Sequence, residues 1–299
     1  MTMEIAWEYD TRVWQQQLRN EDGRWRLIRR IKDSRADDTL RRELSARQLE
    51  EASKTGSVRF PAPERTTEGA VYALTGPELL GSLLWPDPRV SADEITEVMT
   101  TLGGALAELQ RDVAAAASVA GIDSPHLIRL ADHLAAHPTT HAGLVVVQQQ
   151  ATVVERLRAW LAELPREGVL CHGGFTLGSV FVAPDLSRPE VPVGDELMAS
   201  IPELDLGWML GELTEFEYLA QGRGVDPSAY PTAATAFIDG WSSATGRRPD
   251  RRWLDRVIAL RYFLHLCDFA ETTRSTDTGS RNAAFLAWLV ERADAPAGA

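Results

Sequence analysis

The chain has 299 residues, of which 43 are acidic and 31 basic, so its formal net charge is −12, and 44% of it is hydrophobic. This balance is typical of a folded globular protein, and the negative charge disfavours nucleic acid as a partner, because phosphate contacts need a dense positive surface. Two cysteines are too few for a disulfide framework, and no basic and apolar leader opens the chain. No apolar run reaches the ~20 residues of a membrane span. A cytoplasmic protein without a membrane partner is therefore expected.

The first elements in chain order form a predicted hairpin. Residues 12–19 and 24–32 alternate in the manner of strands. Asp22 and Gly23 lie between them, and an Asp-Gly pair between two such runs is a strong hairpin signal.

A helix and a further strand complete a small predicted sheet region. Residues 36–53 have helical spacing, with Leu40, Leu44 and Leu49 expected to face inward. A proline-rich connection then leads to an apolar strand at residues 70–75, which ends at a Gly-Pro pair. The predicted order up to this point is β-β-α-β.

From residue 91 the chain is mainly helical. Ser91 and Glu94 form a capping box, in which each side chain satisfies a free backbone donor of the other. The helical segments share apolar residues at three-to-four spacing and cover residues 95–106, 152–164, 231–241, 252–271 and 281–292. A strand, a glycine-rich loop and a second strand at residues 169–182 interrupt them. The sequence predicts an α+β fold with a β-rich lobe over residues 1–78 and a mainly helical lobe over residues 79–299.

The segment 169–182 is the most informative part of the sequence. It carries His-Gly-Gly at 172–174 and Gly-Ser at 178–179, followed by an apolar strand. This pattern resembles the catalytic loop of the aminoglycoside phosphotransferase and choline kinase-like family, which has a His-Gly-Asp triplet and then a Gly-Asn pair. The resemblance is good over residues 150–270 and weaker, though compatible, over residues 12–110. It implies a bilobal protein-kinase-like fold with a nucleotide cleft between the lobes.

The residues that carry the family's chemistry are only partly present. The resemblance implies an aspartate that receives the proton of the attacking hydroxyl, and this position is Gly174. It implies an asparagine that helps to hold Mg²⁺, and this position is Ser179, a shorter ligand. The remaining catalytic and metal-binding carboxylate is expected to be Asp195. His172 is expected to brace the loop, and Asp205 to fix backbone at a helix start.

The family's nucleotide anchor requires a strand lysine and a glutamate on the next helix. Lys32 and Lys54 are the two lysines of the chain, and Lys32 precedes Glu43 in the required order, so Lys32 and Glu43 are the expected nucleotide-binding pair. A solvated strand end is the alternative, and Arg29 or Arg30 is a less compact substitute for the lysine. No Gly-x-Gly loop precedes the strand, so no phosphate cradle of backbone amides is predicted.

These departures leave two hypotheses for the function. The first is a pseudokinase that binds a peptide or protein partner, because the base is lost, a metal ligand is weakened and the glycine loop is missing. By analogy, such proteins belong to bacterial maturation of ribosomally made peptides, such as lanthipeptides and thioamide peptides, beside a lyase-like partner in serine or threonine dehydration. The second is an active O-phosphotransferase that uses ATP and Mg²⁺ on a hydroxyl of a small molecule or of a peptide serine or threonine.

Two other site patterns are less well supported. His-Gly-Gly at 172–174 also resembles the oxyanion stretch of lipase-like hydrolases, but the sequence has no Gly-x-Ser-x-Gly elbow. His133, His137 and His141 recur at four-residue spacing, as in some metal sites, but Pro138 interrupts any helix that would align them. A helix end at the surface is the expected place of these histidines.

Overall fold

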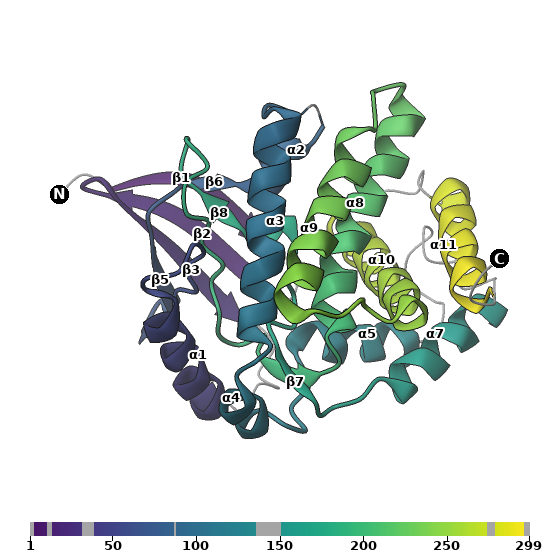
Figure 1. Ribbon diagram of the computed structural model, residues 1–299, viewed down its shortest axis with the longest axis horizontal. Coiled ribbons are helices and arrows are strands. Elements are labelled where there is room, and N and C mark those ends of the chain that lie inside the picture. Colours follow the sequence, from purple (N-terminus) through teal and green to yellow (C-terminus); the bar gives the residue numbers. More distant parts are fainter. Residues whose placement is uncertain are drawn as a thin grey trace.

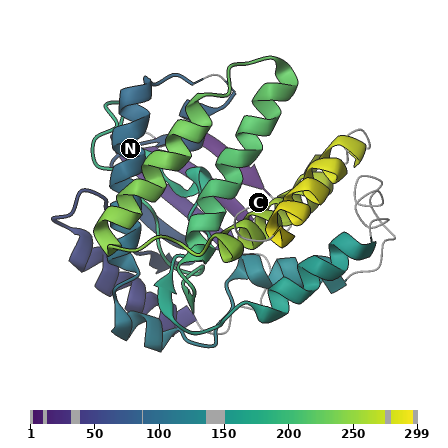
Figure 2. The ribbon, with the colours of Figure 1, turned by 45° about the vertical axis from the view of Figure 1, so that its right-hand side comes forward.

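The computed structural model describes residues 3–10, 14–31, 39–86, 88–135, 151–273 and 279–295. A small antiparallel sheet with one helix forms one part of the molecule, and a larger part is mainly helical (Figures 1 and 2). This arrangement confirms the predicted α+β fold class. None of the helices in the ranges above is both long and apolar enough to cross a bilayer.

The sheet has the strand order β1-β2-β3-β5-β4. Its strands are β1 (Met3–Asp10), β2 (Trp14–Glu21), β3 (Arg24–Ile31), β4 (Glu64–Thr66) and β5 (Gly69–Leu74). The hairpin prediction is confirmed at the turn between β2 and β3, where Asp22 and Gly23 have φ of 51° and 84°, as a two-residue hairpin loop requires. Strands β1 and β4 are absent from the predicted order, and together they form the two edges of the sheet.

Helix α1 (Thr39–Ser53) confirms the predicted helix and the inward position of Leu49, but not that of Leu44, while the side chain of Leu40 lies outside the description. Arg42, Ala46 and Leu49 are buried, whereas Leu44 is 58% exposed, so the prediction that Leu44 faces inward is wrong. The buried positions follow three-to-four spacing, and Leu44 lies off this stripe. Arg42 belongs to it because its guanidinium donates hydrogen bonds of 3.0 and 2.6 Å to two backbone carbonyl oxygens of the helical part.

The helical part begins after β6 (Glu78–Leu79). Its helices are α2 (Leu80–Leu84), α3 (Ala92–Leu109), α4 (Val113–Ser118), α5 (Pro125–Ala135), α7 (Ala151–Glu163), α8 (Glu203–Arg223), α9 (Ala229–Thr245), α10 (Arg251–Thr273) and α11 (Gly279–Asp294). The predicted capping box is confirmed, since Glu94 N–H donates to Ser91 Oγ at 3.3 Å and Ser91 N–H donates to Glu94 Oε2 at 2.8 Å. Strand β6 pairs with β8 (Phe181–Val182), and β7 (Val169–Cys171) pairs with β9 (Met198–Ser200).

Helices α3 and α9 cross with their backbones in contact near the centre of the molecule (Figure 1). A β-carbon on Gly103 would lie 2.1 Å from the carbonyl oxygen of Phe237, and one on Gly240 would lie 2.1 Å from that of Thr100. Only glycine leaves room for this crossing. Helix α8, which carries residues of the site, packs against α9.

The sheet packs directly on the helical part beside β8. Phe181 is fully buried and lies in one apolar cluster with Leu18, Leu27 and Tyr72 from the inner face of the sheet. The ring of Trp7 stacks on Phe181 with 6.4 Å between ring centroids. Side chains therefore fill the space between the sheet and Phe181.

Candidate functional site

The loop between β7 and β8 is fixed by a buried carboxylate. Asp205, in the first turn of α8, accepts hydrogen bonds from the backbone N–H groups of His172 (2.7 Å) and Gly173 (2.9 Å). Gly173 has φ of 80°, and a β-carbon there would lie 2.1 Å from the carbonyl oxygen of Glu196, so this position requires glycine. Burial raises the pKa of Asp205, and His172 and the two N–H donors limit the rise. The backbone-fixing role predicted for Asp205 is confirmed.

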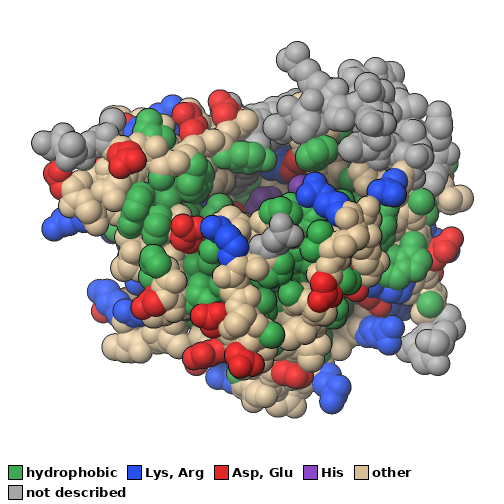
Figure 3. Space-filling model, turned by 90° about the horizontal axis from the view of Figure 1, so that it is seen from above, with side chains coloured by type: hydrophobic (Ala, Val, Ile, Leu, Met, Phe, Trp, Pro, Cys, Tyr) green, Lys and Arg blue, Asp and Glu red, His purple; other side chains and the backbone are tan. Residues whose placement is uncertain are grey.

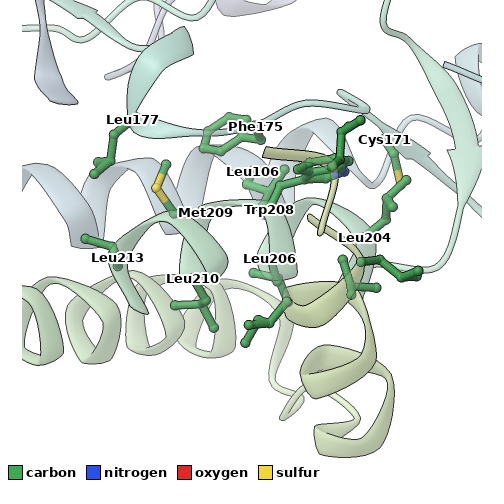
Figure 4. Close-up of a cluster of buried hydrophobic side chains, with 14 of the residues drawn as sticks. Leu106, Cys171, Phe175, Leu177, Leu204, Leu206, Trp208, Met209, Leu210 and Leu213 are labelled. Carbon is green, nitrogen blue, oxygen red and sulfur yellow. The ribbon is translucent and has the colours of Figure 1, made fainter. Parts of the chain in front are cut away.

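His172 braces the same loop from the other side. Its Nε2 lies 2.9 Å from the carbonyl oxygen of Pro192, and its ring meets Phe175 edge to face with 5.7 Å between centroids. Burial lowers the pKa of His172, so the neutral imidazole donates Nε2–H to this carbonyl. Phe175 and Leu177 of the loop lie among apolar side chains of α8, such as Met209 (Figure 4). His172 therefore connects the loop to the segment that leads to Asp195.

The hydroxyl group of Ser179 forms its hydrogen bonds within the loop itself. It is the last residue of a short 3₁₀ turn, η1 (Leu177–Ser179). Its Oγ donates to the carbonyl oxygen of Thr176 at 2.7 Å and accepts from the N–H of Thr176 at 3.0 Å. These two hydrogen bonds make Ser179 a cap of the turn.

Arg65 of β4 holds Asp195 with both ends of its guanidinium. Arg65 Nη1 donates to Asp195 Oδ2 at 3.1 Å, and Nη2 donates to Oδ1. The Nε of Arg65 donates to Glu43 Oε1 at 2.6 Å. Glu43 thus binds Arg65, while its predicted partner Lys32 lies outside the described residues. No sequence pattern pointed to Arg65, because it lies in a short polar strand.

A second arginine holds the next carboxylate of the chain. Arg29 Nη1, from β3, lies 2.9 Å from Glu196 Oε1, and both side chains are buried. Burial raises the pKa of Glu196, and Arg29 opposes this rise. Arg29 also lies over the ring of Tyr72, 5.5 Å from its centroid. Of the two arginines considered as substitutes for the anchor lysine, Arg29 faces the site, whereas Arg30 is exposed at the sheet surface.

The site contains a cavity of about 200 Å³ between the sheet and the helical part. Its lining residues come from distant segments, among them Tyr9 of β1, Gln16 of β2, His126 and Arg129 of α5, Trp208 of α8 and Arg261 of α10. Histidine side chains are visible in the hollowed middle of this face (Figure 3). His126 lies beside Gly174, where no sequence pattern indicated a histidine.

Arg261 and His265, which line this cavity on the helical side, contact Glu215 behind them. Glu215 of α8 binds Arg261, and its carboxylate lies 2.7 Å from His265 Nδ1. Burial alone would raise the pKa of Glu215, but His265 and Arg261 lower it to about 2. These contacts connect α8 with α10. His133, one of the three evenly spaced histidines, lies 3.8 Å from Asp268 nearby, and the other two lie outside the described residues.

Comparison with known proteins identifies the family. The model of the phosphotransferase enzyme family matches residues 3–191, which is more than half of the chain. The chain belongs to the phosphotransferase enzyme family. No curated protein matches it by sequence.

Solved phosphotransferase structures share its kinase-like fold. A spectinomycin phosphotransferase, solved with ADP and spectinomycin, has 14% identity and a TM-score of 0.54 over 99% of this chain and 93% of that chain. A choline/ethanolamine kinase family protein from Mesorhizobium loti has 16% identity and a TM-score of 0.56, covering 99% and 89%. A thermostable mutant of aminoglycoside phosphotransferase APH(4)-Ia has 13% identity and a TM-score of 0.56, covering 99% and 96%. At these identities the likeness shows the fold alone.

The Mg²⁺ that the phosphotransferase family implies does not fit the residues at this site. Both carboxylate oxygens of Asp195 accept from Arg65, and the Ser179 hydroxyl is engaged by Thr176. Gly174 offers no side chain. In the part of the chain that the structure describes, no three His, Cys, Asp or Glu side chains are grouped as metal ligands. Metal binding by Asp195 and Ser179, and nucleotide binding by Lys32 and Glu43, therefore stay predictions.

Proposed function

We propose that this phosphotransferase-family protein is a pseudokinase that binds a peptide or protein partner at the cavity beside its catalytic-type loop. The observation that carries the proposal is the pairing of Asp195 with Arg65. A guanidinium that satisfies both oxygens of a buried carboxylate takes the position that a cation requires. A metal ion has to displace Arg65 and leave it beside a second positive charge.

The packing between the two parts of the molecule supports the same proposal. Phe181 and Tyr72 are fully buried in the cluster that joins the sheet to the helical part. An adenine ring beneath the sheet has to displace such side chains. The cavity of about 200 Å³ is smaller than the ~300–1,000 Å³ typical of cofactor and drug-sized sites, and it suits a side chain of a bound peptide.

The proposed setting is bacterial maturation of a ribosomally made peptide of the lanthipeptide or thioamide type. There this chain would present the peptide to a lyase-like partner that dehydrates serine or threonine. The support for this setting is the analogy with phosphotransferase-like proteins of such pathways. The support from the molecule is a braced loop and a cavity lined by several polar side chains, although position 174 has no carboxylate.

An active O-phosphotransferase that uses ATP and Mg²⁺ is the second candidate. One observation favours it: the imidazole of His126 lies beside Gly174, so the place of the missing aspartate still holds a hydrogen-bonding group. Related phosphotransferases were also solved with ADP or GDP. The acceptor in this case is a hydroxyl of a small molecule or of a peptide serine or threonine.

Titration calorimetry with Mg²⁺-ATP and Mg²⁺-GTP, followed by a phosphate-release assay, separates the two candidates. The pseudokinase proposal predicts no binding heat at millimolar nucleotide and no turnover above buffer. Turnover that disappears in Asp195→Ala but persists in Asp185→Ala would overturn it. Asp185 is a suitable control because it is an exposed aspartate that hydrogen-bonds Ser187 outside the site.

A further inference from the structure

Strand β1 leaves one long edge of the sheet open. It is the first strand in the order β1-β2-β3-β5-β4 and has eight residues, whereas β4, at the opposite edge, has three (Figure 1). All residues from 4 to 10 except Trp7 are exposed. An open edge presents backbone N–H and C=O groups that can pair with another extended chain.

The register of the sheet shows which backbone groups of β1 face outward. Glu21 and Arg24 flank the two-residue loop between β2 and β3, and such a flanking pair exchanges backbone hydrogen bonds. Because these pairs alternate along a strand, Gln16 turns toward β1 instead, where it pairs with Tyr9. The backbone groups of the next residue, Glu8, therefore point away from the sheet. Among the described residues, neither of them has a hydrogen-bond partner.

This edge strand is acidic, whereas the inner strand β3 is basic. Strand β1 carries Glu4, Glu8 and Asp10 and no lysine or arginine, while β3 carries four arginines. The carboxylate of Glu8 accepts from the neutral amide groups of Gln15 at 3.0 Å and Gln17 at 3.4 Å, and these contacts leave its charge in place. Two copies of such an edge repel each other, whereas a strand with basic side chains is attracted.

The same edge borders the cavity of the candidate site. Tyr9, Gln16 and Arg29 are paired directly across β1, β2 and β3, and all three line the cavity. A strand added to β1 extends this row by one residue. Directly paired residues have their side chains on the same face of a sheet, so the residue opposite Tyr9 faces the cavity. The residue opposite Glu8 lies on the other face.

We propose that the peptide partner binds as an additional strand along β1, with basic side chains at alternate positions beside Glu8 and a serine or threonine between them that faces the cavity. Main-chain hydrogen bonds to Glu8 supply affinity, and the alternating side chains supply specificity. A bulge between Ile5 and Trp7 limits the regular edge to the residues that follow it. The inference rests on the proposed function, because it names the conformation and the charge of the peptide.

Fluorescence anisotropy with a capped, labelled peptide, Lys-Ser-Lys-Ser-Lys-Ser-Lys, tests this mode of binding on the full chain. The native chain is expected to bind it at least about tenfold more tightly than a peptide with glutamate in place of lysine. Two further peptides carry N-methyl groups on all lysines or on all serines. An added strand turns only alternate N–H groups toward β1, so one set is expected to weaken binding at least about tenfold and the other less than about threefold.

Two variants at Glu8 separate the backbone contribution from the charge. Glu8→Pro removes the outward N–H and keeps the pairing with β2, because an edge strand accepts proline where the N–H faces solvent. It is expected to weaken binding at least about tenfold. Glu8→Gln keeps the N–H and loses one exposed charge, so it is expected to weaken binding less than about fivefold. Circular dichroism melting confirms that each variant is folded, and the methylated peptides test the native chain independently of both.

The outcomes separate this binding mode from the function on which it rests. Equal effects of the two methylated sets, or a loss in Glu8→Pro no larger than in Glu8→Gln, overturn the added strand and leave peptide binding intact. Absence of binding of the lysine peptide at millimolar concentration overturns the basic, extended partner. Nucleotide turnover in the assay described above overturns the pseudokinase proposal, whichever result the methylated peptides give.

Discussion

Replacing Arg65 with alanine tests whether an arginine occupies the place of a cation beside Asp195. In the native chain the Asp195 side chain is 4% exposed, and both of its oxygens accept from Arg65. Glu43 accepts from the Nε of the same arginine at 2.6 Å. The variant Arg65→Ala therefore leaves two carboxylates facing the space that one guanidinium had filled.

The expected loss follows from the burial of the pair. Removing one partner of a buried ion pair costs about 3–5 kcal/mol, because the other charge stays in a poorly solvated place. The Arg65 side chain is 32% exposed, so water reaches part of the gap, and we expect the lower limit of about 3 kcal/mol. The two released carboxylates are ligands that Mg²⁺ accepts. Mg²⁺ at ten times its Kd would raise the free energy of unfolding of the variant by about 1.4 kcal/mol.

Urea unfolding followed by tryptophan fluorescence, with and without about 10 mM MgCl₂, measures both effects. Arg89→Ala is the matched control, because Arg89 pairs with Glu78 at 3.8 Å with both side chains exposed. The control is expected to lose less than about 1 kcal/mol and to show no Mg²⁺ response. The reasoning fails if Arg65→Ala is as stable as the control, or if Mg²⁺ stabilises the native chain as much as the variant.

Three further predictions concern the frame around the site. Asp205→Ala leaves two backbone N–H groups of the loop without their acceptor and is expected to cost about 2–6 kcal/mol in urea unfolding, at about 1–3 kcal/mol each; a loss below this range contradicts the role of Asp205. Gly240→Val is expected to prevent folding, judged by circular dichroism, whereas Gly104→Ala, where no atom lies within 4 Å of the new carbon, is expected to be tolerated or stabilising. Glu215 has a folded pKa of about 2, below its ordinary value, so its contribution is present above about pH 5 and is lost as pH falls toward 2. Stability measured from pH 6 to 3 should therefore fall less steeply in Glu215→Gln than in the native chain.

Elements that depend on neighbouring residues were predictable from the sequence. The Asp-Gly hairpin and the capping box at Ser91 each depend on residues within one turn, and both are present. The inward face of α1 was not predictable, because it depends on what the helix packs against. Arg42 lies on the buried face, where two carbonyl oxygens of distant segments accept its hydrogen bonds, and Leu44 lies off that face and is exposed.

The candidate site likewise has a part that the local sequence predicts and a part that it does not. The resemblance located the loop and its two altered positions, because these lie within one short segment of sequence. The groups that now surround those positions come from elsewhere: Arg65 is separated from Asp195 by 130 positions and lies in a strand without any motif. Side-chain partners of this kind are set by the packing of the sheet on the helical part, which no local pattern encodes.

Because of these distant partners, the residues of the degenerate motif do not by themselves show which chemical groups are available at the site. By sequence, position 174 has lost its functional group and Asp195 has kept one. In space the reverse holds, because an imidazole lies where the side chain of residue 174 is missing, and an arginine saturates the carboxylate that is retained. A residue identity shows only which group the chain supplies at a position. Whether that group is available to a ligand depends on the neighbours that compete for it, and at Asp195 that neighbour is Arg65.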